Sequence, residues 1–165
     1  MNEELMQRAK RIRLLVLDVD GVLTDGRLYI SAHGEEVKAF HVRDGAGIVA
    51  AQKAGIVVAI ITGRHSEAVV RRAEELGIRH VEQGVADKAV ALETLRRHVG
   101  VAAEEVACIG DDTPDVPMLR RAALAVAVAD AHPAAKAAAH WVTTTGGGCG
   151  AVREACDLLL SARTS

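Results

Sequence analysis

The sequence contains very few aromatic residues and has almost no net charge. Aromatic side chains make up 2% of its 165 residues, and the formal net charge is −2 at pH 7. Proteins that bind single-stranded nucleic acids stack the bases on aromatic side chains, and a basic surface is typical of proteins that bind nucleic acids or anionic membranes. The composition therefore argues against both kinds of partner.

Cysteines and membrane-targeting segments are equally scarce. The three cysteines, Cys108, Cys149 and Cys156, contain no CxxC pair and cannot all pair with one another. The acidic N-terminus lacks the apolar stretch of a signal peptide, and no uncharged run reaches membrane-spanning length. We therefore expect reduced thiols and a cytoplasmic protein.

Aliphatic residues are abundant, and they occur in short runs that alternate with segments of helical periodicity. The runs predict strands at residues 13–18, 56–61, 78–83, 105–109, 124–129 and 140–142. The intervening segments predict helices at residues 2–11, 44–53, 66–76, 86–99, from 133, and 150–161, with Asp44 and Ser66 as caps. This alternation predicts a single α/β domain over residues 1–165, with a three-layer, Rossmann-like parallel sheet and helices on both faces.

Residues 27–42 interrupt this alternation. Two apolar stretches flank a turn at Gly34, which predicts a β-hairpin inserted after the first strand. The hairpin contains the only tyrosine and the only phenylalanine of the chain, Tyr29 and Phe40. Since an isolated hairpin is marginally stable in water, we expect it to pack on another surface, and a neighbouring subunit is a good candidate.

Polar clusters follow three of the expected strands. They are Asp18-Val19-Asp20-Gly21, Thr62-Gly63-Arg64 and Gly110-Asp111-Asp112. Because ligands bind beyond the carboxyl ends of parallel strands, the clusters should converge at one edge of the sheet. Two carboxylates as close as Asp18 and Asp20 repel each other unless a cation lies between them or one holds a proton. The pattern predicts a magnesium site with an acid–base partner.

These residue types meet the requirements of phosphoryl transfer, which needs a nucleophile, a counter-ion and a general acid. Asp18 is the best candidate nucleophile, since a carboxylate can carry a phosphoryl group as an acyl phosphate. Asp20 can protonate the leaving oxygen and then accept a proton from water. Thr62, Gly63 and Lys88 can bind the phosphoryl oxygens.

Further acidic residues complete the predicted metal site. Asp111, together with Asp18 and a backbone carbonyl, supplies the all-oxygen shell that Mg²⁺ prefers, and Asp112 and Asp115 can orient waters or Lys88. Each residue also has an ordinary interpretation as a turn residue, a helix cap or a solvated side chain. Their order at successive strand ends favours the functional interpretation.

The motifs DVDGVLTDG, ITGR, Lys88 and GDDTPD resemble those of the haloacid dehalogenase superfamily of aspartate-nucleophile phosphotransferases. The resemblance covers nearly the whole chain. It is strongest to the capless branch typified by 3-deoxy-D-manno-octulosonate (KDO) 8-phosphate phosphatases, in residues 40–48 and in the tail at residues 150–154.

That resemblance implies residue roles and an assembly. Asp18 is the nucleophile and Asp20 the acid–base, Thr62 and Lys88 bind phosphate, and Asp18, Asp111 and the Asp20 carbonyl hold Mg²⁺. Phosphatases of the superfamily carry aspartate at the position of Asp20, and the chain has no room for the cap domain that mutases need, so hydrolysis is favoured. The branch forms homotetramers in which the hairpin closes a neighbour's active site, and it acts in KDO and lipopolysaccharide biosynthesis.

The substrate is predicted from fewer residues. Arg64 is positioned to bind a substrate carboxylate, and Arg43 either contributes or lies on the surface. Cys149 departs from the pattern, because relatives commonly have arginine at this point of the glycine-rich tail. Three hypotheses follow: a KDO 8-phosphate phosphatase, a phosphatase of another sugar-acid phosphate such as a nonulosonate 9-phosphate, or a non-catalytic oligomerisation module. The complete set of motif residues argues against the last.

Overall fold

The protein, described here by a computed structural model for residues 3–34 and 36–164, is built around a six-stranded parallel sheet. The strand order is β5-β4-β1-β6-β7-β8. The strands are β1 (Leu14–Leu17), β4 (Val57–Ile61), β5 (His80–Glu82), β6 (Val106–Gly110), β7 (Leu124–Ala127) and β8 (Trp141–Val142). The sequence therefore predicted the fold class correctly.

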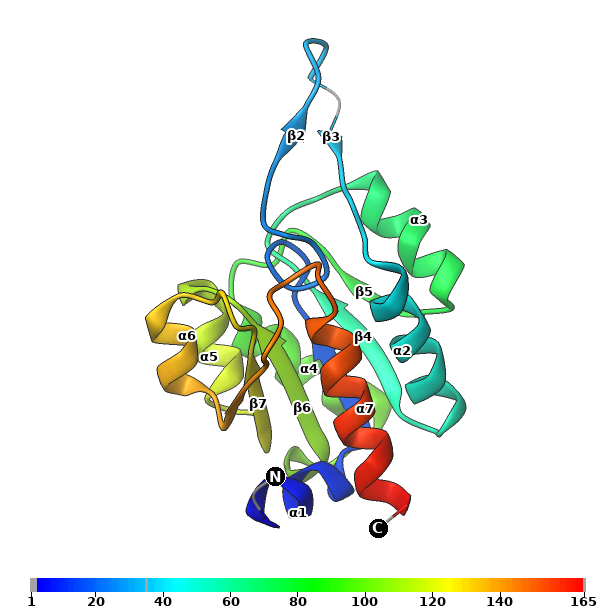
Figure 1. Cartoon of the computed structure of the whole chain (residues 1–165), viewed down its shortest axis with the longest axis vertical. Coiled ribbons are helices and arrows are strands. Elements are labelled where there is room, and N and C mark those ends of the chain that lie inside the picture. The colour runs from blue at the N-terminus through cyan, green and yellow to red at the C-terminus, as the bar shows by residue number, and fades with distance from the viewer. Residues whose placement is uncertain (1–2, 35, 165) are drawn as a thin grey trace.

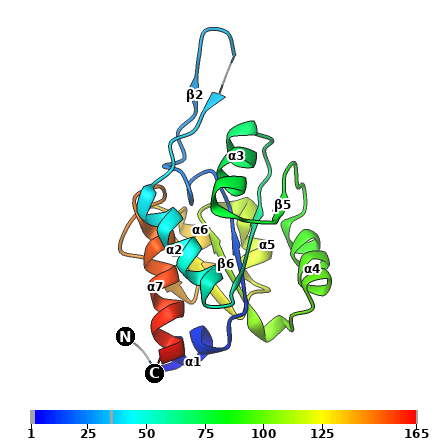
Figure 2. The ribbon, with the colours of Figure 1, turned by 90° about the vertical axis from the view of Figure 1, so that its right-hand side faces the viewer.

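Helices cover both faces of this sheet. They are α1 (Glu3–Arg11), α2 (Val42–Lys53), α3 (Glu67–Leu76), α4 (Lys88–Val99), α5 (Val116–Leu119), α6 (Pro133–Ala138) and α7 (Ala151–Thr164), with 3₁₀ turns η1 (Ala103–Glu105) and η2 (Thr113–Asp115). Helices α2 and α7 lie side by side on one face, and α4 and α5 lie on the other (Figures 1 and 2). Strand β1 pairs with β4 and β6, and all four of its residues are buried. A strand covered on both faces explains why its sequence is uniformly aliphatic rather than alternating.

The start of α2 differs from the prediction. His41 is the N-cap, and its Nδ1 accepts a hydrogen bond from the N–H of Arg43 at 3.1 Å. The assignment of Asp44 as the cap was therefore wrong. Asp44 lies buried in the first turn of α2, and its Oδ1 accepts a hydrogen bond from the N–H of Arg153 in the first turn of α7 at 2.8 Å. Asp44 thus caps the neighbouring helix rather than its own, and burial raises the pKa of its carboxyl.

Ser66 occupies the N-cap position of α3 as expected, but its side chain makes no capping hydrogen bond. The backbone N–H of Ser66 donates a hydrogen bond to Oε1 of Gln83 at 2.8 Å. Helix α4 has a full cap, because Asp87 Oδ1 accepts hydrogen bonds from the N–H groups of Ala89 and Val90. This cap fixes Lys88 as the first residue of α4.

The predicted hairpin is present and projects from the body of the molecule (Figures 1 and 2). Its strands, β2 (Tyr29–Ile30) and β3 (Glu36–Val37), are short and antiparallel. The side chains of Tyr29, Ile30 and Val37 are exposed. Phe40, by contrast, packs against the core, and the Arg72 guanidinium lies 5.8 Å from the centre of its ring. Among the large hydrophobic side chains of the described part of the hairpin, Phe40 is therefore the one that packs on the core.

Two further expectations from the sequence concern the state of the cysteines and membrane-spanning segments. Cys108, Cys149 and Cys156 are free thiols, as predicted, and burial raises the pKa of Cys156 to about 12. In the described part of the chain, no helix combines the length and apolar character needed to cross a membrane.

Candidate active site

The loop after β1 is held by hydrogen bonds of its own backbone. The N–H groups of residues 22–24 all donate to the carbonyl oxygen of Val19 at 2.9 to 3.1 Å. The buried Thr24 hydroxyl accepts hydrogen bonds from the N–H groups of Gly21 and Gly26, each at 3.2 Å. These contacts fold the chain tightly just beyond the strand, which places Asp18 and Asp20 at the edge of the sheet.

Two glycines allow other segments to approach this loop closely. Gly21 has φ of +91°, and a Cβ there would lie 2.0 Å from Oδ2 of Asp111, so both its conformation and its surroundings exclude a side chain. A Cβ on Gly147 would lie 1.8 Å from the Gly21 carbonyl oxygen. The N–H of Gly148 also donates to the Val22 carbonyl at 3.0 Å. The glycine-rich tail therefore packs directly on the first motif of its own chain.

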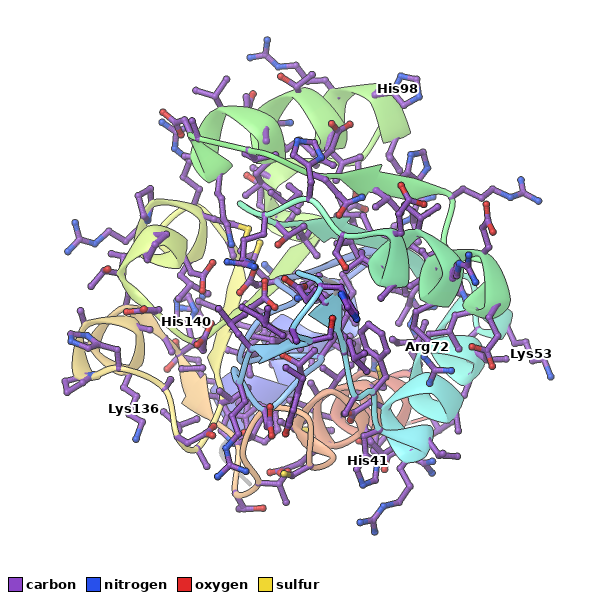
Figure 3. The ribbon with its side chains drawn as sticks, turned by 90° about the horizontal axis from the view of Figure 1, so that it is seen from above. His41, Lys53, Arg72, His98, Lys136 and His140 are labelled. Atoms are coloured by element: carbon purple, nitrogen blue, oxygen red, sulfur yellow. The ribbon has the colours of Figure 1, made fainter. Side chains whose placement is uncertain are left out.

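The three predicted strand-end clusters meet in one cavity of about 360 Å³. It is lined by Asp18, Asp20, Gly26, Leu28, Thr62, Gly63, Arg64, Asp111, Asp112, Pro114 and Asp115. Figure 3 looks down on this edge of the sheet, where the ends of the central strands face the viewer. Parallel topology thus brings together residues that lie far apart in the sequence.

Three carboxylates that line the cavity form a cluster with one buried lysine, Lys88. Oxygen atoms of Asp18, Asp111 and Asp115 all lie within 4.8 Å of one another. Lys88 Nζ lies 2.7 Å from Asp18 Oδ1 and 2.6 Å from Asp115 Oδ1, and all three side chains are buried. Oδ2 of Asp115 accepts hydrogen bonds from the N–H groups of Asp111 and Asp112 at 2.8 and 3.1 Å.

The electrostatics of this cluster favour a bound cation. Burial raises the pKa of Asp18 to about 6; Asp115 adds to the shift and Lys88 opposes it. Burial and the nearby Asp18 and Asp115 raise the pKa of Asp111 to about 8. Burial alone would lower the pKa of Lys88, but its pairs with Asp18 and Asp115 raise it above the ordinary value. The site therefore holds more negative charge than Lys88 alone neutralises.

The donor set fits Mg²⁺, which binds carboxylate and carbonyl oxygens. Both oxygens of Asp115 already have partners, Lys88 on one side and two backbone N–H groups on the other. Asp18 and Asp111 are therefore the carboxylates best able to hold the ion. Asp115 fits the predicted supporting role, because its hydrogen bonds fix both Lys88 and the backbone of Asp111.

Asp20 belongs to a second charged cluster that the sequence did not indicate. Asp20 Oδ1 lies 2.5 Å from Lys38 Nζ, which lies 2.6 Å from Glu36 Oε1. Glu36 Oε2 accepts a hydrogen bond from Arg64 Nη2 at 2.5 Å, and Arg64 Nε lies 3.8 Å from Asp20 Oδ2. These four residues, the Asp20 ring, alternate in charge around a closed loop. The available signal was the spacing of Glu36 and Lys38, which places both on one side of an extended segment and Val37 on the other.

Other predicted site residues are placed as follows. Thr62 is buried, and Gly63 and Arg64 are exposed, all along the cavity that contains Asp18. Arg43 and Cys149 lie elsewhere, in a hollow of about 250 Å³ that they share with Arg153 and neighbouring residues. A contact of Arg43 or Cys149 with substrate in the cavity of their own chain therefore has no support in the structure, and their part in binding stays a prediction.

Comparison with known proteins agrees with this geometry. Residues 77–152 match the family model described as haloacid dehalogenase-like hydrolase. The chain is 50% identical over 163 residues to the KDO 8-phosphate phosphatase of Escherichia coli BL21-DE3, which covers 99% of this chain and 87% of that protein. The chain belongs to the KDO 8-phosphate phosphatase family. Within it, the crystal structure of the Yersinia pestis phosphatase has a TM-score of 0.97 and 50% identity, covering 99% of this chain and 89% of that one.

A second solved member of the family bears on the cavity. The phosphatase of Moraxella catarrhalis, in complex with magnesium ion, phosphate ion and a KDO molecule, has a TM-score of 0.97 and 44% identity. The match covers 99% of this chain and 94% of that one. The predicted family and fold are therefore confirmed. The roles of individual residues stay predictions.

Proposed function

We propose that this chain is a Mg²⁺-dependent phosphatase that hydrolyses KDO 8-phosphate to KDO and phosphate in the cytoplasm. The observation that carries the proposal is the cluster formed by Asp18 and Asp111, which line the cavity, and by the buried Lys88, whose Nζ lies 2.7 Å from Asp18 Oδ1. It combines a candidate nucleophile, a hard-cation site and a fixed positive charge. The family relationship and the ligands of the Moraxella catarrhalis structure support the same reaction.

In the first half of the reaction, Asp18 attacks the phosphorus atom of the substrate. A bond forms between its carboxylate oxygen and phosphorus while the bond from phosphorus to the sugar oxygen breaks, giving an aspartyl phosphate. Asp20 donates a proton to the departing sugar oxygen. Lys88, the Thr62 hydroxyl and the Gly63 N–H bind the phosphoryl oxygens and stabilise the charge that develops on them.

In the second half, Asp20 accepts a proton from a water molecule as that water attacks the phosphorus. The bond from phosphorus to Asp18 then breaks, which releases inorganic phosphate and restores both carboxyl groups. Mg²⁺ held by Asp18, Asp111 and the Asp20 carbonyl would neutralise charge on the phosphoryl group throughout. Asp112 and Asp115 orient waters or Lys88 beside this centre, and Asp115 holds Lys88 through an ion pair at 2.6 Å.

Arg64 lines the cavity and is partly exposed, so that a substrate carboxylate can reach its guanidinium, although Nη2 is paired with Glu36. We expect Arg64→Ala to raise the KM for KDO 8-phosphate by about 10- to 100-fold, because a charge-assisted hydrogen bond contributes about 1.5–3 kcal/mol. The KM for a hexose phosphate, which has no carboxylate, should stay unchanged. Steady-state phosphate release with both substrates measures the difference.

Arg71→Ala is the matched control, since Arg71 is an exposed arginine of helix α3 that does not line the cavity. Equal losses with both substrates in Arg64→Ala would assign Arg64 to phosphate binding or to folding. Unchanged constants with both would place the carboxylate site elsewhere.

We further propose that the chain forms a homotetramer with the hairpin at the subunit interface. The supporting observation is the exposed apolar surface of Tyr29, Ile30 and Val37 on a segment that projects from the body. Ile30→Asp should dissociate the assembly in sedimentation experiments, because burying a new carboxylate in an interface is costly. Val90→Asp is the control, because Val90 is 57% exposed compared with 63% for Ile30 and lies on helix α4. Dissociation by both substitutions or by neither would contradict this interface.

A further inference from the structure

The hairpin places a carboxylate on the arginine that the proposed function assigns to the substrate carboxylate. Glu36 Oε2 lies 2.5 Å from Arg64 Nη2, and the other oxygen of Glu36 lies 2.6 Å from Lys38 Nζ. The Lys38 side chain is 2% exposed, whereas that of Arg64 is 47% exposed. Glu36 is therefore held by one buried and one accessible cation.

This arrangement has a direct consequence for an acidic ligand. A carboxylate that approaches the exposed side of Arg64 meets a guanidinium whose Nη2 already donates to Glu36. Two carboxylates that share one guanidinium also repel each other. A substrate carboxylate must therefore displace Glu36 from Arg64 or bind less favourably beside it.

The surroundings of Glu36 make its displacement easy. When Oε2 leaves Arg64, Oε1 can keep its ion pair with Lys38, so the carboxylate is not left without a partner. The Lys38 side chain is 2% exposed and also lies 2.5 Å from Asp20 Oδ1, so it stays in place beside Glu36 when Oε2 leaves Arg64.

We propose that Glu36 is an internal competitor for the substrate carboxylate on Arg64 and sets the affinity of the site for acidic ligands. This inference rests on the proposed function and adds a specificity-determining residue to it. Both the substrate and the sugar-acid product carry the carboxylate, but only the substrate also binds through its phosphoryl group. Weakening the carboxylate contact therefore leaves the substrate anchored at Lys88 and Thr62 while the product dissociates readily.

The test compares wild-type protein with Glu36→Gln, both at full length and with Mg²⁺ present. The neutral amide competes weakly for Arg64, so the inhibition constant of free KDO should fall by about fivefold, the effect expected for an exposed ion pair. The inhibition constant of inorganic phosphate, which binds in the same cavity, should not change. Glu74→Gln, at an exposed glutamate of helix α3 outside the cavity, should leave both constants at wild-type values.

A double-mutant cycle separates competition from a structural role. In an Arg64→Ala background, Glu36→Gln should no longer change the affinity for KDO, because the contested guanidinium is absent. Glu36→Asp keeps the charge but reaches less far, so it should tighten KDO binding by a smaller factor, about twofold. If Glu36→Gln does not fold, the KDO inhibition constant of Glu36→Asp still tests the proposal.

The outcomes distinguish a failure of the proposed function from a failure of the inference about Glu36. Wild-type protein that neither hydrolyses KDO 8-phosphate nor binds KDO would overturn the proposed function, and this inference with it. A wild-type enzyme whose KDO constant is unchanged or weakened in Glu36→Gln, or changed equally with and without Arg64, would overturn the inference alone.

Discussion

Replacing Asp18 with asparagine is expected to lower kcat for KDO 8-phosphate by about 10⁴-fold or more, the usual cost of removing a nucleophile. Asparagine has the same shape but cannot form the aspartyl phosphate. The fold should survive, because Lys88 keeps its ion pair with Asp115, and because burial and Asp115 oppose the charged form of Asp18 more than Lys88 favours it. Without Mg²⁺, the variant should therefore unfold at a temperature no lower than that of the wild-type protein. Phosphate release and thermal unfolding in EDTA measure the two effects.

Asp157→Asn provides the control for this substitution. Asp157 is an exposed aspartate of helix α7 that pairs with Arg153, far from β1 in the sequence. The Asp157→Asn variant should retain wild-type activity and nearly wild-type stability, since an exposed ion pair contributes only about 0.2–1 kcal/mol. Activity of Asp18→Asn within about tenfold of wild type would mean that another group attacks the phosphorus. Wild-type protein with no activity at all would favour the oligomerisation module.

Lys88→Met is expected to have the largest effect on stability. Lys88 lies between Asp18 and Asp115, and all three side chains are buried, so its removal leaves two carboxylates without their cation. Breaking a buried ion pair on one side typically costs about 3–5 kcal/mol. We therefore expect a fall of that size in the free energy of unfolding. We also expect a loss of activity of at least about 100-fold, because the positive charge that binds the phosphoryl oxygens is lost.

Urea unfolding with and without Mg²⁺ separates these two roles of Lys88. Added Mg²⁺ should recover part of the lost stability, because it replaces one positive charge in the cluster, but it should not recover the activity. Lys53→Met is the control, because Lys53 lies on the outside of helix α2, well away from the cavity (Figure 3). Full stability of Lys88→Met in the absence of Mg²⁺ would contradict the buried ion pairs.

The position of the candidate site was predictable because the expected strands and helices allow few arrangements. Uninterrupted aliphatic runs indicate strands covered on both faces, and helices between them require parallel crossovers. Once the strands are parallel, Asp18, Thr62 and Asp111 must lie at the same edge, whatever their separation in the sequence. Lys88 was predictable in the same way, as the first residue of a helix that starts from that edge.

The remaining contacts depend on how separate segments pack, which sequence periodicity does not specify. The role of Asp44 depends on α2 and α7 lying side by side, so local capping rules assigned it to the wrong helix. The Asp20 ring depends on the base of the hairpin folding back over Arg64. The spacing of Glu36 and Lys38 indicated a shared side but not what that side faces.

The placement of the tail has the same origin. The packing of Gly147 against Gly21 follows from a long loop between β8 and α7, which no short-range pattern describes. This packing places Cys149 with Arg43 in a separate hollow. The departure from arginine at Cys149 therefore does not change the lining of the cavity in its own chain.

Phosphate release from a panel of sugar phosphates, with Mg²⁺ and with EDTA, tests the central claim most directly. The panel contains KDO 8-phosphate, a nonulosonate 9-phosphate and simple hexose phosphates. We predict Mg²⁺-dependent release with a strong preference for KDO 8-phosphate. Even activity across the panel would contradict the substrate assignment, and the absence of metal-dependent release from every compound would contradict the enzyme.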